Sequence, residues 1–264
     1  MEGDIPENQT PVTPRPAATI ILLRDGTNGL EFLVLRKASG KHFAAGALVF
    51  PGGSVHGEDT AYIEDKGGDT GSESLEPLKV AAVREMYEEA AIILGRDRQT
   101  GKMLNHADVA RMRAEGPADD FFALMAAHDF EPAIDQLERM AHWITPPSRP
   151  KRFDTHFFIA PVPGDQMEPV VDGYEIVAGA WRRPADLLAR MEAGEFKMVL
   201  PTMLNVSKLQ RWNSVDEAMA AVREEEVVCV QPVRKQTDEG EFLIIPEEAG
   251  YGVTVIDTAN LRPA

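Results

Sequence analysis

Apolar segments near the start of the chain are separated by short polar turns, which is the pattern of paired β-strands. Residues 17–25 (AATIILLRD) form one apolar run, and residues 30–37 (LEFLVLRK) form a second after the turn residues GTNG. Two such runs around a Gly/Asn turn predict a β-hairpin. Residues 46–53 (GALVFPGG) predict a short strand that ends in a proline and two glycines.

A long helical pattern follows a polar, glycine-rich stretch. Residues 56–73 are expected to form a loop, and residues 74–77 offer a serine, an acidic residue and a proline, which favour a helix start. The helix is expected to run from about Leu78 to Leu94, with Gly95 as its stop. At 100° per residue, one face carries Val80, Val83, Tyr87, Ala90 and Leu94, and the opposite sector carries Glu85, Glu88 and Glu89.

The second half of the chain mixes helical and extended patterns. Residues 96–142 hold three stretches of helical periodicity with few β-branched residues, so two or three short helices inserted as a unit are expected. The other expected elements are strands at 153–162 and 175–183, helices at 184–194 and 200–212, and a hairpin around the turn TDEG within 226–246. This mixture favours an α+β or mixed-sheet sandwich over a doubly wound parallel sheet.

Composition narrows the classes of function. The chain has 264 residues, of which 44% are hydrophobic, enough for one elaborated domain or two small ones. Its formal net charge is −16 and no block of Lys and Arg is present, so we expect no binding to a nucleic acid polymer. An acidic protein needs local cations or a metal to bind an anionic substrate.

Cysteine usage and the apolar runs suggest a compartment. Cys229 is the single cysteine, which excludes an intramolecular disulfide and favours a reducing environment; in its apolar run it is expected to be a small core residue. No apolar run has membrane-spanning length. Residues 1–16 are acidic and proline-rich and do not match a signal peptide, so they are expected to form a flexible tail. We therefore expect a cytoplasmic protein with no membrane contact.

The three glutamates of the predicted helix crowd their charges together. Like charges at i,i+3 and i,i+4 repel by a few tenths of a kcal/mol per pair, so either water screens them or a cation lies among them. A solvated acidic face is the commoner interpretation of such a triplet alone. Hard divalent cations prefer oxygen ligands, however, and Mg²⁺ commonly combines carboxylates with waters and substrate phosphates. Gly52 and Gly53 upstream would permit close approach of the backbone to a ligand.

Residues 52–58 (GGSVHGE) and 84–89 (REMYEE) together resemble the Nudix box, G-x5-E-x7-R-E-U-x-E-E-x-G-U, in which U is bulky and apolar. Five residues separate Gly52 from Glu58, as in the box. The chain departs from it in two ways: 25 residues lie between Glu58 and Arg84 where seven are expected, and Ala91 replaces a glycine. The long gap indicates a loop insertion at residues 59–77 and leaves the role of Glu58 open. The missing glycine indicates that the helix ends a turn later, at Gly95.

The resemblance extends from about Ala17 to Trp212. The long gap, the strand LVFPGG and residues 143–160 (WITPPSRPKRFDTHFFIA) resemble the subgroup that includes the peroxisomal coenzyme A diphosphatases and bacterial relatives. It implies a Nudix-type α/β/α sandwich with a mixed sheet over residues 17–215, with the helical insertion at 96–142. Residues 216–264 are then expected to be a C-terminal β-hairpin extension packed on that domain.

The resemblance also implies a chemistry, the hydrolysis of a diphosphate bond with Mg²⁺ or Mn²⁺ as cofactor. It implies three catalytic residues, Arg84, Glu85 and Glu89; four metal ligands, Glu85, Glu88, Glu89 and Gly52; and three substrate contacts, Arg36, Gly53 and Glu175. Arg84 would orient the box through carboxylate contacts, with a weak surface ion pair as the alternative. Which carboxylate is the general base stays open, and Arg36 and Glu175 have the alternative of plain strand-end surface residues.

Several substrates suit this pattern. Coenzyme A or an acyl-CoA is the first expectation, and NADH or ADP-ribose is the second. A non-catalytic Nudix-fold sensor of a nucleotide is a third hypothesis, but clustered acids argue against it because a binding module does not need them. We expect a monomer or a homodimer with a small-molecule diphosphate substrate. His156 alternates with apolar neighbours and is expected in the core or the wall of the site.

Overall fold

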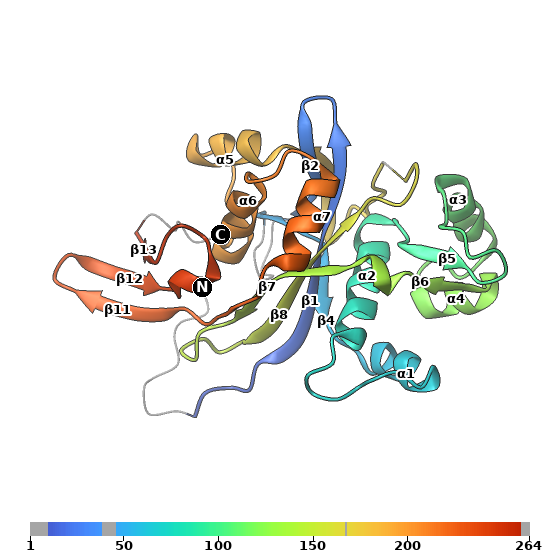
Figure 1. The fold of residues 1–264 in the computed structure, drawn as a ribbon, viewed down its shortest axis with the longest axis horizontal. Helices are drawn as coiled ribbons and strands as arrows, with labels where there is room; N and C mark the ends of the chain where they lie inside the picture. The colour runs from blue at the N-terminus through green and yellow to red at the C-terminus, as the bar shows by residue number, and fades with distance from the viewer. Residues whose placement is uncertain (1–9, 39–45, 167, 260–264) are drawn as a thin grey trace.

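The protein is organised around an eight-stranded mixed sheet with helices on both faces (Figure 1). The computed structural model describes residues 10–38, 46–166 and 168–259. The strand order is β10-β7-β8-β1-β2-β3, with β4 paired to β1 and β9 paired to β2. β1 runs parallel to β8 and β10 runs parallel to β7, whereas the other pairs are antiparallel. This confirms the expected α/β/α sandwich with a mixed sheet.

The strands of the main sheet are β1 (Arg15–Gly26), β2 (Gly29–Lys37), β3 (Leu48–Val49), β4 (Gly52–Ser54), β7 (Glu138–Ile144), β8 (Phe153–Pro161), β9 (Ile176–Arg182) and β10 (Cys229–Val230). A two-stranded sheet consists of β5 (Gly95–Asp97) and β6 (Phe130–Pro132). A three-stranded sheet consists of β11 (Val233–Thr237), β12 (Gly240–Ile244) and β13 (Val255–Asp257). The predicted hairpin at residues 17–37 is confirmed by the antiparallel pairing of β1 with β2.

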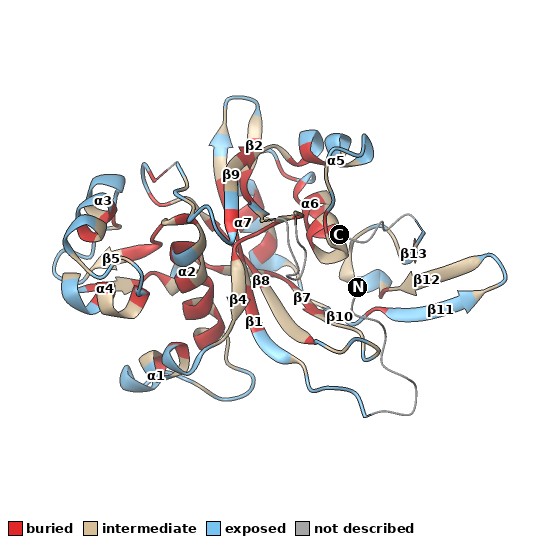
Figure 2. Ribbon diagram, turned by 180° about the vertical axis from the view of Figure 1, so that it is seen from behind, coloured by how far each residue is buried: buried red, intermediate tan, exposed pale blue. Residues whose placement is uncertain are grey.

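The helices divide between the two faces of the main sheet (Figures 1 and 2). One side carries α1 (Gly57–Asp65), α2 (Glu76–Ala90), α3 (His106–Glu115), α4 (Phe121–His128) and the 3₁₀ turn Ile134–Gln136. The other side carries α5 (Pro184–Glu192), α6 (Leu200–Leu209) and α7 (Val215–Glu224), and a second 3₁₀ turn lies at Glu247–Ala249.

Alternation of side chains along β1 separates two hydrophobic cores, because successive residues of a strand point to opposite faces. Ile20 and Leu22 pack with α2 and the inserted helices in one core. Ile21 and Leu23 pack with α5, α6 and α7 in the other. Figure 2 shows buried residues on both sides of the sheet. The acidic helix therefore belongs to the first core.

Two predicted elements are wrong. Residues 57–65 form helix α1 rather than a loop, and its first turn is held by a buried carboxylate, Asp59, which accepts a hydrogen bond from the His56 backbone N–H. Residues 138–144 form strand β7 rather than a helix, and β7 lies in the main sheet between β8 and β10. The predicted helical insertion therefore holds two α-helices, α3 and α4, and its last residues belong to the central sheet.

The C-terminal region shares the second core. Tyr251 accepts a hydrogen bond from the indole of Trp143 at 2.9 Å and donates one to Asn205 at 2.7 Å. The predicted hairpin around TDEG is confirmed as β11 and β12. Helix α7 was not among the predicted elements. Cys229 is exposed on β10 at the edge of the main sheet, so its prediction as a core residue is wrong.

The N-terminal segment enters the sheet earlier than expected. Residues 1–9 of the predicted tail lie outside the described residues, whereas Arg15 and Pro16 already belong to β1 and pair with β8. Among the described residues, none of the helices has the length and apolar character needed to cross a membrane.

Candidate active site

Helix α2 holds its glutamates against the protein rather than on a solvated face. Val80, Val83 and Ala90 are fully buried, as the helical pattern predicted. The side chains of Glu85 and Glu89 are nevertheless only 12% and 11% exposed. Glu88, which is 38% exposed, is the most open of the three acids. A solvated acidic face therefore does not describe this helix.

The positive group among these acids is the guanidinium of Arg84. It is 2% exposed and donates from NH1 to Glu85 Oε1 and to Glu88 Oε2, both at 2.8 Å. Its NH2 also donates to the backbone carbonyl of Ser54 in β4 at 3.0 Å. Burial alone would lower the pKa of Arg84, but the surrounding carboxylates raise it, so the side chain stays charged. Arg84 is thus a buried clamp and not a surface ion pair.

Asp59 completes this clamp and was missed in the sequence. It is fully buried in α1 and accepts from Arg84 Nε at 2.9 Å and from NH2 at 3.0 Å. Charge-assisted, two-point contacts of this kind are stronger than neutral hydrogen bonds, and they also fix the orientation of the two side chains. Glu58 is exposed, one residue earlier. Five residues separate Gly53 from Asp59, so the box spacing is met one position later than the sequence suggested.

The two glycines of β4 bring the backbone into contact with the acids. The backbone N–H of Gly52 donates to Glu89 Oε2 at 3.0 Å. A Cβ at Gly53 would lie 2.4 Å from Glu85 Oε1, well inside van der Waals contact. The absence of a side chain at Gly53 is therefore what allows the carboxylate of Glu85 to lie against β4.

Lys37, at the end of β2, is the second cation near the acids. Its Nζ lies 3.1 Å from Glu175 Oε1 and 4.0 Å from Glu89 Oε1. The structure thus brings Glu175, which is largely exposed, to the edge of the acidic group through Lys37. Arg36 is exposed, and β2 places its side chain on the opposite face from that of Lys37. The predicted substrate contacts of Arg36, Gly53 and Glu175 stay predictions.

Helix α2 ends earlier than the sequence indicated. Its last residue is Ala90, and Ala91 adopts the left-handed conformation with φ 55° while its N–H donates to the carbonyl of Tyr87. The prediction that the helix continues to Leu94 and stops at Gly95 is wrong. Ala91 performs the backbone role usually taken by glycine, at a cost of about 1 kcal/mol.

Burial disfavours the charged forms of Glu88 and Glu89, and the nearby cations compensate for this only in part. It raises the pKa of Glu89 to about 8, against the opposing effects of Lys37 and the Gly52 N–H. Burial also raises the pKa of Glu88, although Arg84 opposes this. Arg84 engages one oxygen of Glu85 and one of Glu88, and the second oxygen of each has no hydrogen-bond partner among the described residues. Such a donor set fits a hard divalent cation, which would restore the charged form of each carboxylate.

The raised pKa of Glu89 predicts a pH-dependent stability in the absence of metal. Since its folded pKa exceeds its ordinary value of 4.5, the folded protein keeps a proton that the unfolded chain loses. The retained proton favours the folded state. Its contribution to the unfolding free energy is fully present below about pH 4.5 and is lost as the pH rises through 8. We expect Glu89→Gln to remove a fall in unfolding free energy of about 3–4 kcal/mol between pH 5 and pH 8. Urea unfolding in chelator measures it.

The matched control is Glu115→Gln, which removes an exposed carboxylate on α3 that does not act on the pKa of Glu89 and should keep the wild-type pH dependence. If Glu89→Gln keeps it as well, the buried carboxyl of Glu89 is not the group responsible.

Comparisons with known proteins agree on one family. The family model described as the NUDT19 Nudix domain matches residues 69–209, more than half of the chain. The crystal structure of a NUDIX hydrolase from Alicyclobacillus acidocaldarius aligns with a TM-score of 0.66 and 30% sequence identity, covering 79% of this chain and 96% of that one.

Two curated proteins are also similar. The putative nudix hydrolase 7 of Caenorhabditis elegans is 26% identical over 225 residues, which cover 83% of this chain and 68% of that protein. The acyl-coenzyme A diphosphatase NUDT19 of Gallus gallus is 24% identical over 237 residues, 71% of this chain and 63% of that protein, so the match spans less than two thirds of the chicken protein. With the buried arginine clamp and the three glutamates of α2, these matches identify the chain as a member of the Nudix hydrolase family.

Proposed function

We propose that this protein hydrolyses the diphosphate bond of a nucleoside-diphosphate-linked substrate at the acidic group of α2. The observation that carries the proposal is the buried contact of Arg84 with Asp59, Glu85 and Glu88. A binding module has no need to fix several carboxylates around one guanidinium inside the protein. A diphosphate hydrolase needs such an arrangement, because its metal ligands must be held in place before the substrate binds.

Glu85, Glu88 and Glu89 are the proposed ligands of Mg²⁺ or Mn²⁺, together with the carbonyl of Gly52. When bound, such an ion neutralises the diphosphate and makes a water molecule more acidic. The chain's own residues do the positioning. Arg84 orients Glu85 and Glu88, and the Gly52 N–H orients Glu89.

Lys37 extends the proposed site toward the substrate. Its ammonium group lies between Glu89 and Glu175, where it can bind a phosphate oxygen. Proton transfer from water is assigned to Glu85 or Glu89, because both carboxylates are mostly buried beside β4 and are fixed by hydrogen bonds.

Coenzyme A or an acyl-CoA is the preferred substrate. The similar chicken protein is named an acyl-coenzyme A diphosphatase, and the sequence resembles the same subgroup. The inserted helix α4 packs on α2 through Phe121 and Tyr87, with ring centroids 5.9 Å apart, so the insertion borders the acidic helix and can influence substrate choice. The alternative substrates are NADH and ADP-ribose.

The test is chromatography of the products formed from coenzyme A, an acyl-CoA, NADH and ADP-ribose with Mg²⁺ or Mn²⁺. We expect wild type to split the diphosphate of coenzyme A into 4′-phosphopantetheine and 3′,5′-ADP. Glu88→Gln should lower kcat/KM at least about tenfold, because it removes one charged ligand of the metal. Its carboxylate is the most exposed of the three, so the fold should tolerate the change.

The matched control is Glu115→Gln, which removes an exposed carboxylate on α3 and should leave kcat/KM unchanged. Turnover of NADH or ADP-ribose alone would favour the alternative substrates. Ligand binding without turnover of any substrate would favour the nucleotide sensor, and equal turnover by wild type and Glu88→Gln would overturn the metal assignment.

A further inference from the structure

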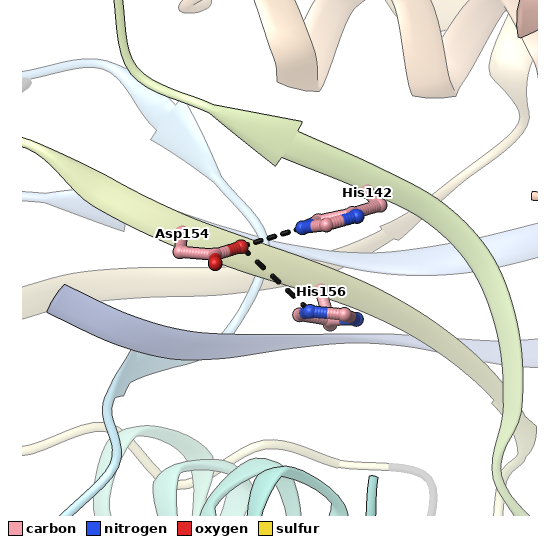
Figure 3. A group of neighbouring side chains, drawn as sticks. All are labelled: His142, Asp154 and His156. Atoms are coloured by element: carbon pink, nitrogen blue, oxygen red, sulfur yellow. Dashed lines mark hydrogen bonds and ion pairs between the residues drawn. The ribbon is translucent and has the colours of Figure 1, made fainter. Parts of the chain in front are cut away.

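A second cluster of ligand-type side chains lies on β7 and β8, outside the acidic group of α2. His142 and His156 stand directly opposite each other in the antiparallel pairing of these strands, with ring centroids 4.0 Å apart. Asp154 lies two residues before His156 on the same face of β8. Figure 3 shows both imidazole rings beside one oxygen of the Asp154 carboxylate.

The ligand atoms of this cluster already converge. His142 Nε2 lies 2.5 Å from Asp154 Oδ1, and His156 Nε2 lies 3.7 Å from the same oxygen. Ligand atoms around a tetrahedral ion with bonds of 2.0–2.1 Å are about 3.3 Å apart. The two observed distances bracket this value, and the two rings, which are stacked with an interplanar angle of 22°, would turn toward a shared ion on binding it. Among the described residues, this is the one group of three or more His, Cys, Asp or Glu whose ligand atoms all lie within 4.8 Å of one another.

The two histidines of the cluster are mostly buried, but the cluster is accessible to solvent through Asp154. The side chains of His142 and His156 are 17% and 12% exposed, whereas Asp154 is 36% exposed and keeps the cluster open to solvent. His156 Nδ1 is buried and has no hydrogen-bond partner among the described residues, so the nitrogen that faces Asp154 is Nε2. Burial also lowers the pKa of His156 to about 4, which leaves the ring neutral at pH 7 with a lone pair available.

We propose that His142, Asp154 and His156 bind one divalent transition-metal ion, with Zn²⁺ as the representative ion, and leave a fourth position to solvent. Two imidazoles and one carboxylate form a donor set that suits zinc and its neighbours in the first transition row, whereas Mg²⁺ prefers oxygen ligands throughout. The site therefore differs in ion preference from the acidic group of α2 and does not depend on the proposed function.

The pairing of β1 with β4 and with β8 sets the distance between the histidine cluster and the acidic group of α2. Ala18 of β1 pairs with His156 on one side and with Gly53 of β4 on the other. One strand therefore separates His156 from Gly53, which corresponds to about 10 Å between their backbones. His156 stacks on Phe158, a residue of the core beneath α2, so the cluster shares the sheet face on which Glu85 lies. The ligand sets do not overlap, so each site can be removed separately.

The experiment is titration of the untagged chain, residues 1–264, with Zn²⁺ against a chromogenic chelator in excess Mg²⁺, which saturates oxygen-only sites. We expect one tight equivalent of Zn²⁺ in wild type and at least tenfold weaker binding in His142→Ala and in Asp154→Asn. His106→Ala, which removes a surface histidine from α3, and Glu88→Gln should both bind as wild type does.

A measurement on wild type alone guards against variants that fail to fold. In ¹H–¹⁵N spectra of the histidine rings, one equivalent of Zn²⁺ should shift two of the six histidines. Absence of a tight equivalent in wild type, unchanged affinity in both cluster variants, or an equal loss in His106→Ala would overturn the proposal. Shifts spread over other histidines would overturn it as well.

Discussion

Replacing Arg84 with methionine is expected to lower the unfolding free energy by about 3–5 kcal/mol. The substitution keeps much of the side-chain volume but leaves the fully buried carboxylate of Asp59 without its two-point partner. It also leaves Glu85 and Glu88 facing each other without a cation between them. Urea unfolding at pH 7 in the presence of chelator measures the loss.

A double-mutant cycle separates the buried pair from general damage. Asp59→Asn alone should also destabilise, because Arg84 then keeps a buried charge with one partner fewer. The double variant Arg84→Met/Asp59→Asn should lose less than the sum of the single losses, because it removes both charges of this pair and leaves neither of them unmatched. The matched control Arg183→Met breaks the exposed pair with Asp186 and should cost no more than about 1 kcal/mol. Additive losses in the cycle would show that Arg84 and Asp59 are not coupled.

Replacing Gly53 with alanine is expected to lower kcat/KM about 100-fold with little change in stability. The new methyl group would occupy space now taken by the carboxylate of Glu85, whose Oε1 lies 2.4 Å from the position of that Cβ. A glutamate side chain can rotate away at small cost, so the fold should survive. The carboxylate would then be displaced by an ångström or more, and misplacement on this scale can cost about 100-fold in rate. The assay is hydrolysis of the preferred diphosphate substrate with saturating Mg²⁺, beside a thermal unfolding curve.

Two neighbouring glycines serve as controls for this variant. Gly57→Ala puts a methyl group into open space and should change neither activity nor stability. Gly52→Ala places its Cβ 2.5 Å from the backbone carbonyl of Ala18, which cannot move aside cheaply, so it should destabilise the protein. Full activity of Gly53→Ala would mean that the position of Glu85 against β4 is not required.

Helix α2 was predictable because the pattern that identifies it lies within the helix itself. The apolar positions of α2 recur at helical spacing and are buried as expected, and the three glutamates are brought to one region beside β4. The role of Arg84 as their partner followed from the resemblance, but its depth of burial did not. That depth depends on α1 and β4, which approach Arg84 only in the folded protein.

Helix α1 was not predictable in this way. Residues 57–65 contain few apolar side chains, and only Asp59 and Ile63 are buried. The segment is helical because Asp59 caps its first turn and pairs with Arg84, which lies 25 residues away in the sequence. An ion pair between distant residues leaves no periodic trace, so the sequence pointed to Glu58, the neighbouring acid.

Strand β7 was mistaken for a helix because its pairing is irregular. The register with β8 shifts between Arg139 and Ala141, so the adjacent residues Met140 and Ala141 are both buried. Such a bulge breaks the alternation of buried and exposed positions that identifies a strand. Two consecutive apolar residues beside charged ones then mimic helical spacing.

The separation of the two cores by a single sheet has a consequence for the evolution of this protein. The core beneath α2 lies on the same face of the sheet as the arginine clamp, the glycines of β4 and the inserted helices. Helices α5, α6 and α7 and the C-terminal strands pack in the other core. Substitutions at distant sites that share no partners act almost additively. A lineage can therefore remodel its C-terminal half, gaining or losing strands such as β11 to β13, while selection on catalysis acts on the opposite face undisturbed.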